Sequence, residues 1–114
     1  MNNFEMKYKL FCDYTREIHT MRGIKPLDDE SMKFLYDSYI TETKVEWVNV
    51  FSDTGDVIGF FIIDFYPNCH PDADFYIEEA YIVPEYRKCG YMSKAISQYV
   101  NTNPGTYFYF IVKI

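Results

Sequence analysis

The segment YIVPEYRKCGYMSKAI, residues 81–96, joins an apolar strand to an amphipathic helix. Pro84 ends the strand pattern, because proline has no backbone N–H to donate to a sheet ladder. The basic pair Arg87 and Lys88 follows, and apolar residues recur at helical spacing after Gly90. The whole chain carries a formal net charge of −6, so two cations beside a glycine at this junction need a physical reason.

Two interpretations of the junction follow from its residue types. The first N–H groups of a helix lack intrahelical acceptors and the helix dipole makes this end partially positive, so an anion such as a pyrophosphate can bind there. Gly90 lets the anion approach the backbone because it has no Cβ. Arg87, Lys88 and Ser93 add two charges and a hydroxyl. Basic loop residues are also common without any ligand, so spacing alone leaves an anion site and an ordinary loop both open.

The segment resembles the acetyl-coenzyme A signature of the GCN5-related N-acetyltransferase (GNAT) superfamily, written R/Q-x-x-G-x-G/A. Arg87 matches the first position and Gly90 the central glycine, whereas Met92 departs from the usual Gly or Ala. RxxGYM followed by Ser or Thr resembles the ribosomal-protein and antibiotic acetyltransferase branches. The order of elements also resembles the family, including the strand that contains Gly59. The chain covers the family fold without its C-terminal part.

The resemblance implies acetyl-CoA as cosubstrate, with its pyrophosphate on the backbone N–H groups of the signature loop. It also implies that the pantetheine lies beside the strand backbone at Ile82 and Val83, either of which offers an N–H to the oxyanion. Arg87 then orders the loop or contacts phosphate. The implied pyrophosphate-binding residues are Lys88, Cys89, Gly90, Tyr91, Met92 and Ser93.

Glu78 and Glu79 precede this site, in the region where some family members carry a general base. Strand alternation points them to opposite faces, so at most one faces an amine acceptor. Each also fits a solvated carboxylate, and the sequence does not choose between the two.

Composition sets limits on the class of protein. At 114 residues, 48% hydrophobic and 20% aromatic, we expect one packed domain over residues 1–114. No apolar run is long enough to cross a bilayer and the N-terminus lacks a signal segment, so we predict a cytoplasmic protein without membrane contact. The acidic balance argues against nucleic-acid binding. The cysteines and histidines lack zinc-like spacing, so we expect reduced thiols and no metal site: Cys12, His19, Cys69, His70 and Cys89.

The periodicities predict an α+β fold, with a mixed, mostly antiparallel sheet flanked by helices. The expected elements, in order, are a short strand over Phe4–Leu10, a helix capped by Asp13 and ended by Gly23, a helix over about 28–40, a hairpin around the turn SDTGD whose second strand runs over Val57–Phe65, a strand over 75–83, a helix from Gly90 to about Val100, and a strand over 106–114.

The C-terminus bears on catalysis and on assembly. Family members continue into another helix and a strand pair, and that helix often carries a tyrosine that protonates the departing thiolate. The chain ends at Ile114, so we expect this acid to be missing or supplied by another residue. The strand TYFYFIVKI has Lys113 as its one charge, and such an edge favours a homodimer.

Three hypotheses about function follow. The first is an acyl-CoA N-acyltransferase that moves an acetyl group from acetyl-CoA to an unidentified amine. The second is a truncated relative that holds coenzyme A without turnover, as a binding or interaction module. The third is an unrelated α+β protein that places a glycine at a helix start.

Overall fold

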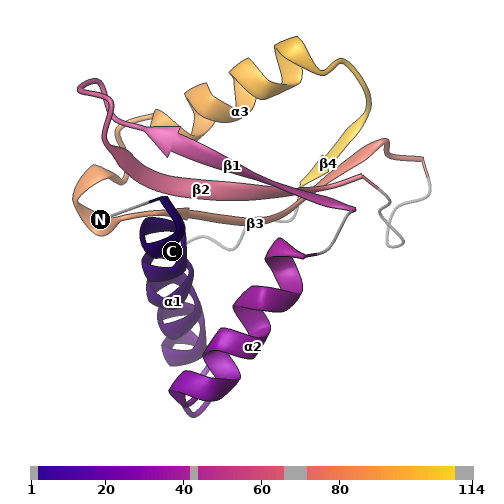
Figure 1. The fold of residues 1–114 in the computed structure, drawn as a ribbon. Helices are drawn as coiled ribbons and strands as arrows, with labels where there is room; N and C mark the ends of the chain where they lie inside the picture. The colour runs from indigo at the N-terminus through magenta and orange to yellow at the C-terminus, as the bar shows by residue number, and fades with distance from the viewer. Residues whose placement is uncertain (1–2, 42–43, 66–71, 110–114) are drawn as a thin grey trace. The chain divides into compact units, whose positions relative to one another are not determined.

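The computed structural model describes residues 3–41, 44–65 and 72–109. The chain forms two compact units, Met1–Glu42 and Thr43–Ile114, and each is described by itself (Figure 1). The single domain over residues 1–114 therefore stays a prediction. Over the described residues, no helix is both long enough and apolar enough to span a bilayer.

The first unit consists of two helices, α1 (Asn3–Met21) and α2 (Asp29–Ile40). The expected strand over Phe4–Leu10 is wrong, because α1 runs through it without a break. Phe4 and Tyr8 lie one helical turn apart, and both rings contact the ring of Tyr36 on α2, with centroids 5.9 and 5.1 Å away. Packing between the two helices thus selects the helical period where the sequence fits both periods.

Asp13 does not cap a helix. It lies within α1, where its carboxylate is 2.8 Å from the Lys9 ammonium one turn earlier. The predicted stop at Gly23 is confirmed. Its φ of +66° is left-handed, and the N–H of Ile24 donates to the carbonyl of His19 across 2.8 Å, which closes the helix end.

The predicted second helix is confirmed as α2. Asp28 is its N-cap and accepts a hydrogen bond from the N–H of Ser31 across 2.7 Å. Hydrogen bonds from the backbone and the side chain of Ser31 favour the charged carboxylate and lower the pKa of Asp28 below its usual range. Met32 and Tyr36 of α2 are buried.

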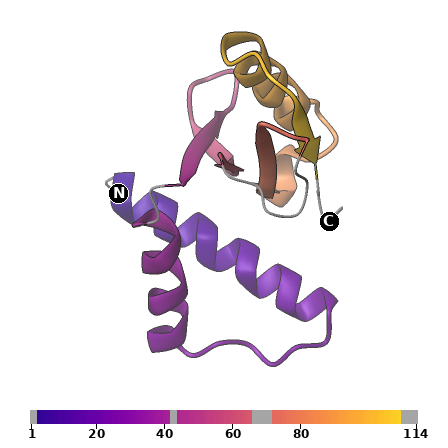
Figure 2. The same ribbon diagram turned by 90° about the vertical axis from the view of Figure 1, so that its right-hand side faces the viewer.

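The second unit is an α+β arrangement, as predicted. Its sheet has the order β1-β2-β3-β4, in which the first three strands are antiparallel and β4 is parallel to β3. Figure 2 shows helix α3 lying along one face of these strands. The bounds are β1 Val45–Phe51, β2 Val57–Asp64, β3 Phe75–Ile82, the 3-10 turn η1 Pro84–Tyr86, α3 Tyr91–Thr102 and β4 Tyr107–Tyr109.

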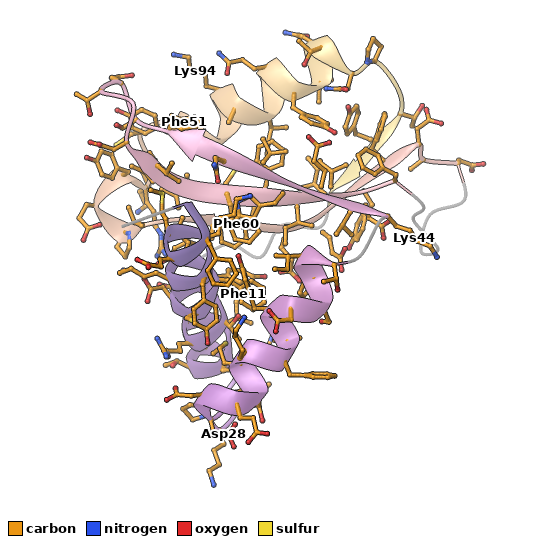
Figure 3. All side chains as sticks on the ribbon, viewed as in Figure 1. Phe11, Asp28, Lys44, Phe51, Phe60 and Lys94 are labelled. Atoms are coloured by element: carbon orange, nitrogen blue, oxygen red, sulfur yellow. The ribbon has the colours of Figure 1, made fainter. Side chains whose placement is uncertain are left out.

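Strand β2 lies at the centre of the core, and its residues 60–63 are buried on both faces of the sheet. On one face Phe61 packs in a cluster with Ile96 and Tyr99 of α3. On the other face Phe60, labelled in Figure 3, stacks on Trp47 with centroids 4.0 Å apart. This core fixes the end of β3 and the start of α3, which frame the candidate site.

Several predictions concern residues outside the described part of the chain. Strand 106–114 is confirmed as β4 through Tyr109, and the positions after it are not described. The proposed dimer edge depends on those positions and stays a prediction. Cys69 and His70 also lie outside the described residues. Cys12 and Cys89 are free thiols, and the described residues contain no cluster of three metal-ligating side chains.

Candidate active site

The strand-to-helix junction is built by local backbone structure. Strand β3 ends at Ile82, and Pro84 opens the single turn η1, where the N–H of Tyr86 donates to the carbonyl of Val83 across 3.0 Å. Pro84 thus ends the strand as predicted. The signature loop, defined here as residues 87–93, follows and carries the chain into α3.

Two residues of the signature loop adopt left-handed backbone conformations. Lys88 has φ +63° and Gly90 has φ +85°, with Cys89 between them outside this region. Such alternation turns successive N–H groups toward one side, which forms a concave anion-binding surface. A Cβ at Gly90 would meet no neighbouring atom within 4 Å, so the backbone conformation, and not a packed neighbour, favours glycine here.

Helix α3 begins without a side-chain cap. Gly90 is its N-cap, no side chain caps it, and its first turn contains no acidic residue. The N–H of Lys94 makes the first helical bond, to the carbonyl of Gly90, so the N–H groups of residues 91–93 have no acceptor within the helix. Helix α2 differs, since it has the Asp28 cap and two acidic residues in its first turn. The start of α3 is thus suited to an external anion.

Arg87 connects the signature loop to β3. Its Nε donates to the carbonyl of Ile82 across 2.8 Å, and its guanidinium carbon lies 5.4 Å from the centroid of the Tyr81 ring. Of the two implied roles for Arg87, these contacts favour loop ordering. Lys88 and Cys89 are exposed, and the Cys89 thiol lies 3.4 Å from the carbonyl of Arg87.

The register of β3 distinguishes the two candidate oxyanion donors. The N–H of Val83 donates to the carbonyl of Ile58 on β2 across 2.9 Å. Gly59 pairs with Ile82, and antiparallel ladders alternate, so the N–H and carbonyl of Ile82 point to the opposite edge of β3. That edge faces β4, which pairs with β3 further upstream, at residues 75–77. The Ile82 N–H is therefore the better placed of the two donors.

Glu78 and Glu79 lie at an irregularity in β3. Ile62 pairs with Glu79 and Ile63 with Ile77, so Glu78 is an extra residue and simple alternation does not hold across it. Glu79 is half-buried, and its partner on β2, Ile62, is buried. Burial disfavours its charged form and raises its pKa from the usual 4.5 to about 7. A carboxyl with this pKa can accept a proton near neutral pH.

One contact to the signature loop was missed from the sequence. The Tyr91 hydroxyl donates to Oδ2 of Asp53, in the β1–β2 turn, across 3.2 Å. Both residues line a cavity of about 300 Å³ between the end of β1 and α3, together with Phe51 and Lys94. Figure 3 shows Phe51 and Lys94 at the same end of the second unit. The sequence marked SDTGD as a turn but held no signal that it would meet α3.

Comparisons with known proteins agree with this geometry. A family model described as the acetyltransferase (GNAT) family matches residues 8–102. An acetyltransferase from Vibrio fischeri is similar with a TM-score of 0.56 and 18% identity over 97% of this chain and 92% of that one. An acetyltransferase from Trypanosoma brucei is similar with a TM-score of 0.52 and 15% identity over 94% of this chain and 78% of that one. At these identities the two structures establish a shared fold alone. No curated sequence matches the chain.

Proposed function

The chain belongs to the acetyltransferase (GNAT) family, and we propose that it transfers an acetyl group from acetyl-CoA to an amine. Membership supports acyl transfer in general. The observation that carries the more specific proposal is the uncapped start of α3, preceded by two left-handed residues. This arrangement presents backbone donors to an anion and offers them no acidic partner of their own.

In this proposal the signature loop holds the pyrophosphate of the coenzyme. The N–H groups of residues 88–93 donate to its oxygens, and the Lys88 ammonium and Ser93 hydroxyl, both exposed, lie on the same short segment. Arg87 maintains the loop through Ile82. Acetyl-CoA supplies the activated thioester, and the N–H of Ile82, on the edge of β3 that faces β4, aligns it.

The proposed chemistry assigns two residues of β3. The N–H of Ile82 stabilises the negative charge that develops on the thioester oxygen when the amine attacks the carbonyl carbon. Glu79 accepts a proton from the amine, directly or through one water, as the C–N bond forms. The C–S bond then breaks, and coenzyme A leaves as a thiolate that takes a proton from solvent. Its pKa of about 7 makes a substantial fraction of the residue ionised and ready to accept at neutral pH.

Two measurements test the proposal. Isothermal titration calorimetry with acetyl-CoA tests binding, and thiol release during incubation with a panel of amines tests transfer. We expect binding, and thiol release with at least one amine. Glu79→Gln should bind acetyl-CoA as well as the wild type does, but it should release thiol at least about 100-fold more slowly. Binding without release from any amine would favour the module without turnover, and absence of binding would refute both.

A further inference from the structure

The ammonium of Lys33 lies among three aromatic rings of the first unit. Its Nζ is 5.0 Å from the ring centroid of Phe4, 5.7 Å from that of Tyr8 and 5.8 Å from that of Tyr36. The same nitrogen is 2.7 Å from Oδ1 of Asp37. Rings at this range attract a cation through their quadrupoles, and a carboxylate accepts the hydrogen bond of a primary ammonium. We call Phe4, Tyr8, Tyr36 and Asp37 the ammonium cage.

The walls of the ammonium cage are set by helix spacing and by packing between rings. Phe4 and Tyr8 lie one turn apart on α1, and Tyr36 and Asp37 lie three and four residues after Lys33 on α2. The Tyr36 ring is buried. It meets Phe4 at an interplanar angle of 82° and Tyr8 at 64°. These edge contacts hold the rings without help from the cation.

The enclosure by rings is not a by-product of a Lys–Asp pair on a helix. Lys9 and Asp13 form the same i, i+4 pair on α1 at 2.8 Å, and in the described part of the chain that ammonium makes no cation–π contact. The Lys33 and Asp37 side chains are 45% and 48% exposed. Exposed pairs of this kind contribute little to stability, and lysine has a flexible stem. The stem of Lys33 can therefore swing out of the cage, and a ligand ammonium then replaces the ring and carboxylate contacts that Lys33 gives up.

We propose that the ammonium cage binds the primary alkylammonium group of an external ligand, with Lys33 acting as a displaceable internal occupant. The rings select a cation over a neutral group of the same size, and Asp37 selects an ammonium that retains N–H groups. All four residues belong to the first unit and the signature loop belongs to the second. The proposal is therefore independent of the proposed acetyl transfer.

The test is a titration of the full-length protein with n-butylammonium chloride, followed by NMR shifts of the aromatic side chains. 1-Butanol serves as the neutral probe, and tetramethylammonium as the cation without N–H groups. Lys33→Ala empties the cage, because alanine is too short to reach the rings, and it should bind n-butylammonium about two- to fivefold more tightly than wild type. The matched control Lys9→Ala, which breaks the pair outside the cage, should bind like wild type.

Two further variants assign the contacts. In the Lys33→Ala background, Phe4→Leu should weaken the binding of both cations, because Phe4 is half-exposed and its loss removes one wall without opening the core. Asp37→Asn should weaken n-butylammonium more than tetramethylammonium. Far-UV circular dichroism checks that each variant is folded. Equal shifts with 1-butanol, or equal affinity of folded Lys33→Ala and wild type, would show that Lys33 only covers the rings and would overturn the proposal.

Discussion

The Nε of Arg87 and the carbonyl oxygen of Ile82 are 2.8 Å apart, so a side chain of the signature loop closes back onto the strand before it. The guanidinium also lies over the Tyr81 ring. The loop conformation is therefore tied to β3 before any ligand binds. The sequence left two roles open for Arg87, ordering of the loop and direct contact with phosphate, and this bond supports the first.

The first prediction concerns this bond. Arg87→Ala should lower the free energy of unfolding of the ligand-free protein by about 1–1.5 kcal/mol, because it removes a charge-assisted hydrogen bond and a ring contact. Arg87→Lys should restore little of it, since an ammonium does not reproduce the planar guanidinium. Urea unfolding without ligand measures both variants. Unchanged ligand-free stability, with weaker acetyl-CoA binding, would assign Arg87 to phosphate contact instead.

The second prediction compares Gly90 with Lys88. Gly90→Val places a β-branched side chain at φ +85°, where L-residues cost about 1–2 kcal/mol, and it should both destabilise the loop and weaken acetyl-CoA binding. Lys88→Gly removes the charge at a position whose φ of +63° suits glycine, so it should weaken binding much less. Calorimetry with acetyl-CoA measures both. Comparable losses would mean that side-chain charge, rather than backbone N–H groups, holds the coenzyme.

The third prediction concerns the pH dependence of catalysis. Glu79 must be ionised to accept a proton, and its pKa is about 7, so kcat/KM should rise with pH and level off above this value. Glu79→Gln should abolish this limb. Glu78→Gln is the matched control on the neighbouring residue and should retain it. A profile in which Glu78→Gln removes the limb would reverse the assignment of the base.

The same carboxyl predicts a trend in stability. Its pKa is higher in the folded protein than its usual 4.5, so the folded state binds the proton more tightly than the unfolded state. The associated stabilisation is complete below about pH 4.5 and is lost as the pH rises through about 7. The urea midpoint of wild type should therefore fall from pH 5 to pH 8 more than that of Glu79→Gln. Parallel curves would show that Glu79 titrates normally.

The fifth prediction concerns the link between Tyr91 and Asp53. Tyr91→Phe removes the hydroxyl that donates to Oδ2 of Asp53 and should weaken acetyl-CoA binding about two- to threefold by loosening the start of α3. Asp53→Ala should have a similar effect. The double variant should be no weaker than either single variant, because the two changes remove one contact. Additive losses in calorimetry would mean that the residues act separately.

Much of the fold could be predicted because, in most segments, the spacing of the apolar residues fits either a helix or a strand but not both. The helix after Asp28 and the hairpin around residues 52–56 follow single, consistent patterns with their own cap and turn residues. The N-terminal error has a physical cause. Phe4 and Tyr8 fit both strand and helix spacing, and the deciding partner, Tyr36, lies in another helix.

The strand-to-helix junction that frames the candidate site could be predicted from the sequence, because the glycine, the basic pair and the helix start follow one another along the chain. The geometry around that junction could not be predicted. The extra residue at Glu78 depends on pairing between β2 and β3, which side-chain alternation does not reveal. The use of the Val83 N–H by Ile58 likewise depends on strand register, which only the folded sheet defines.

The missing side-chain cap at the start of α3 affects the stability of the ligand-free protein. A side-chain cap stabilises a helix by about 1 kcal/mol, and the ligand-free fold forgoes this contribution at residues 91–93. An anion that supplies it adds stability in proportion to the logarithm of its concentration once it exceeds its dissociation constant. If the proposed coenzyme is that anion, the resistance of this protein to unfolding, and so its lifetime against proteolysis, follows the concentration of the coenzyme.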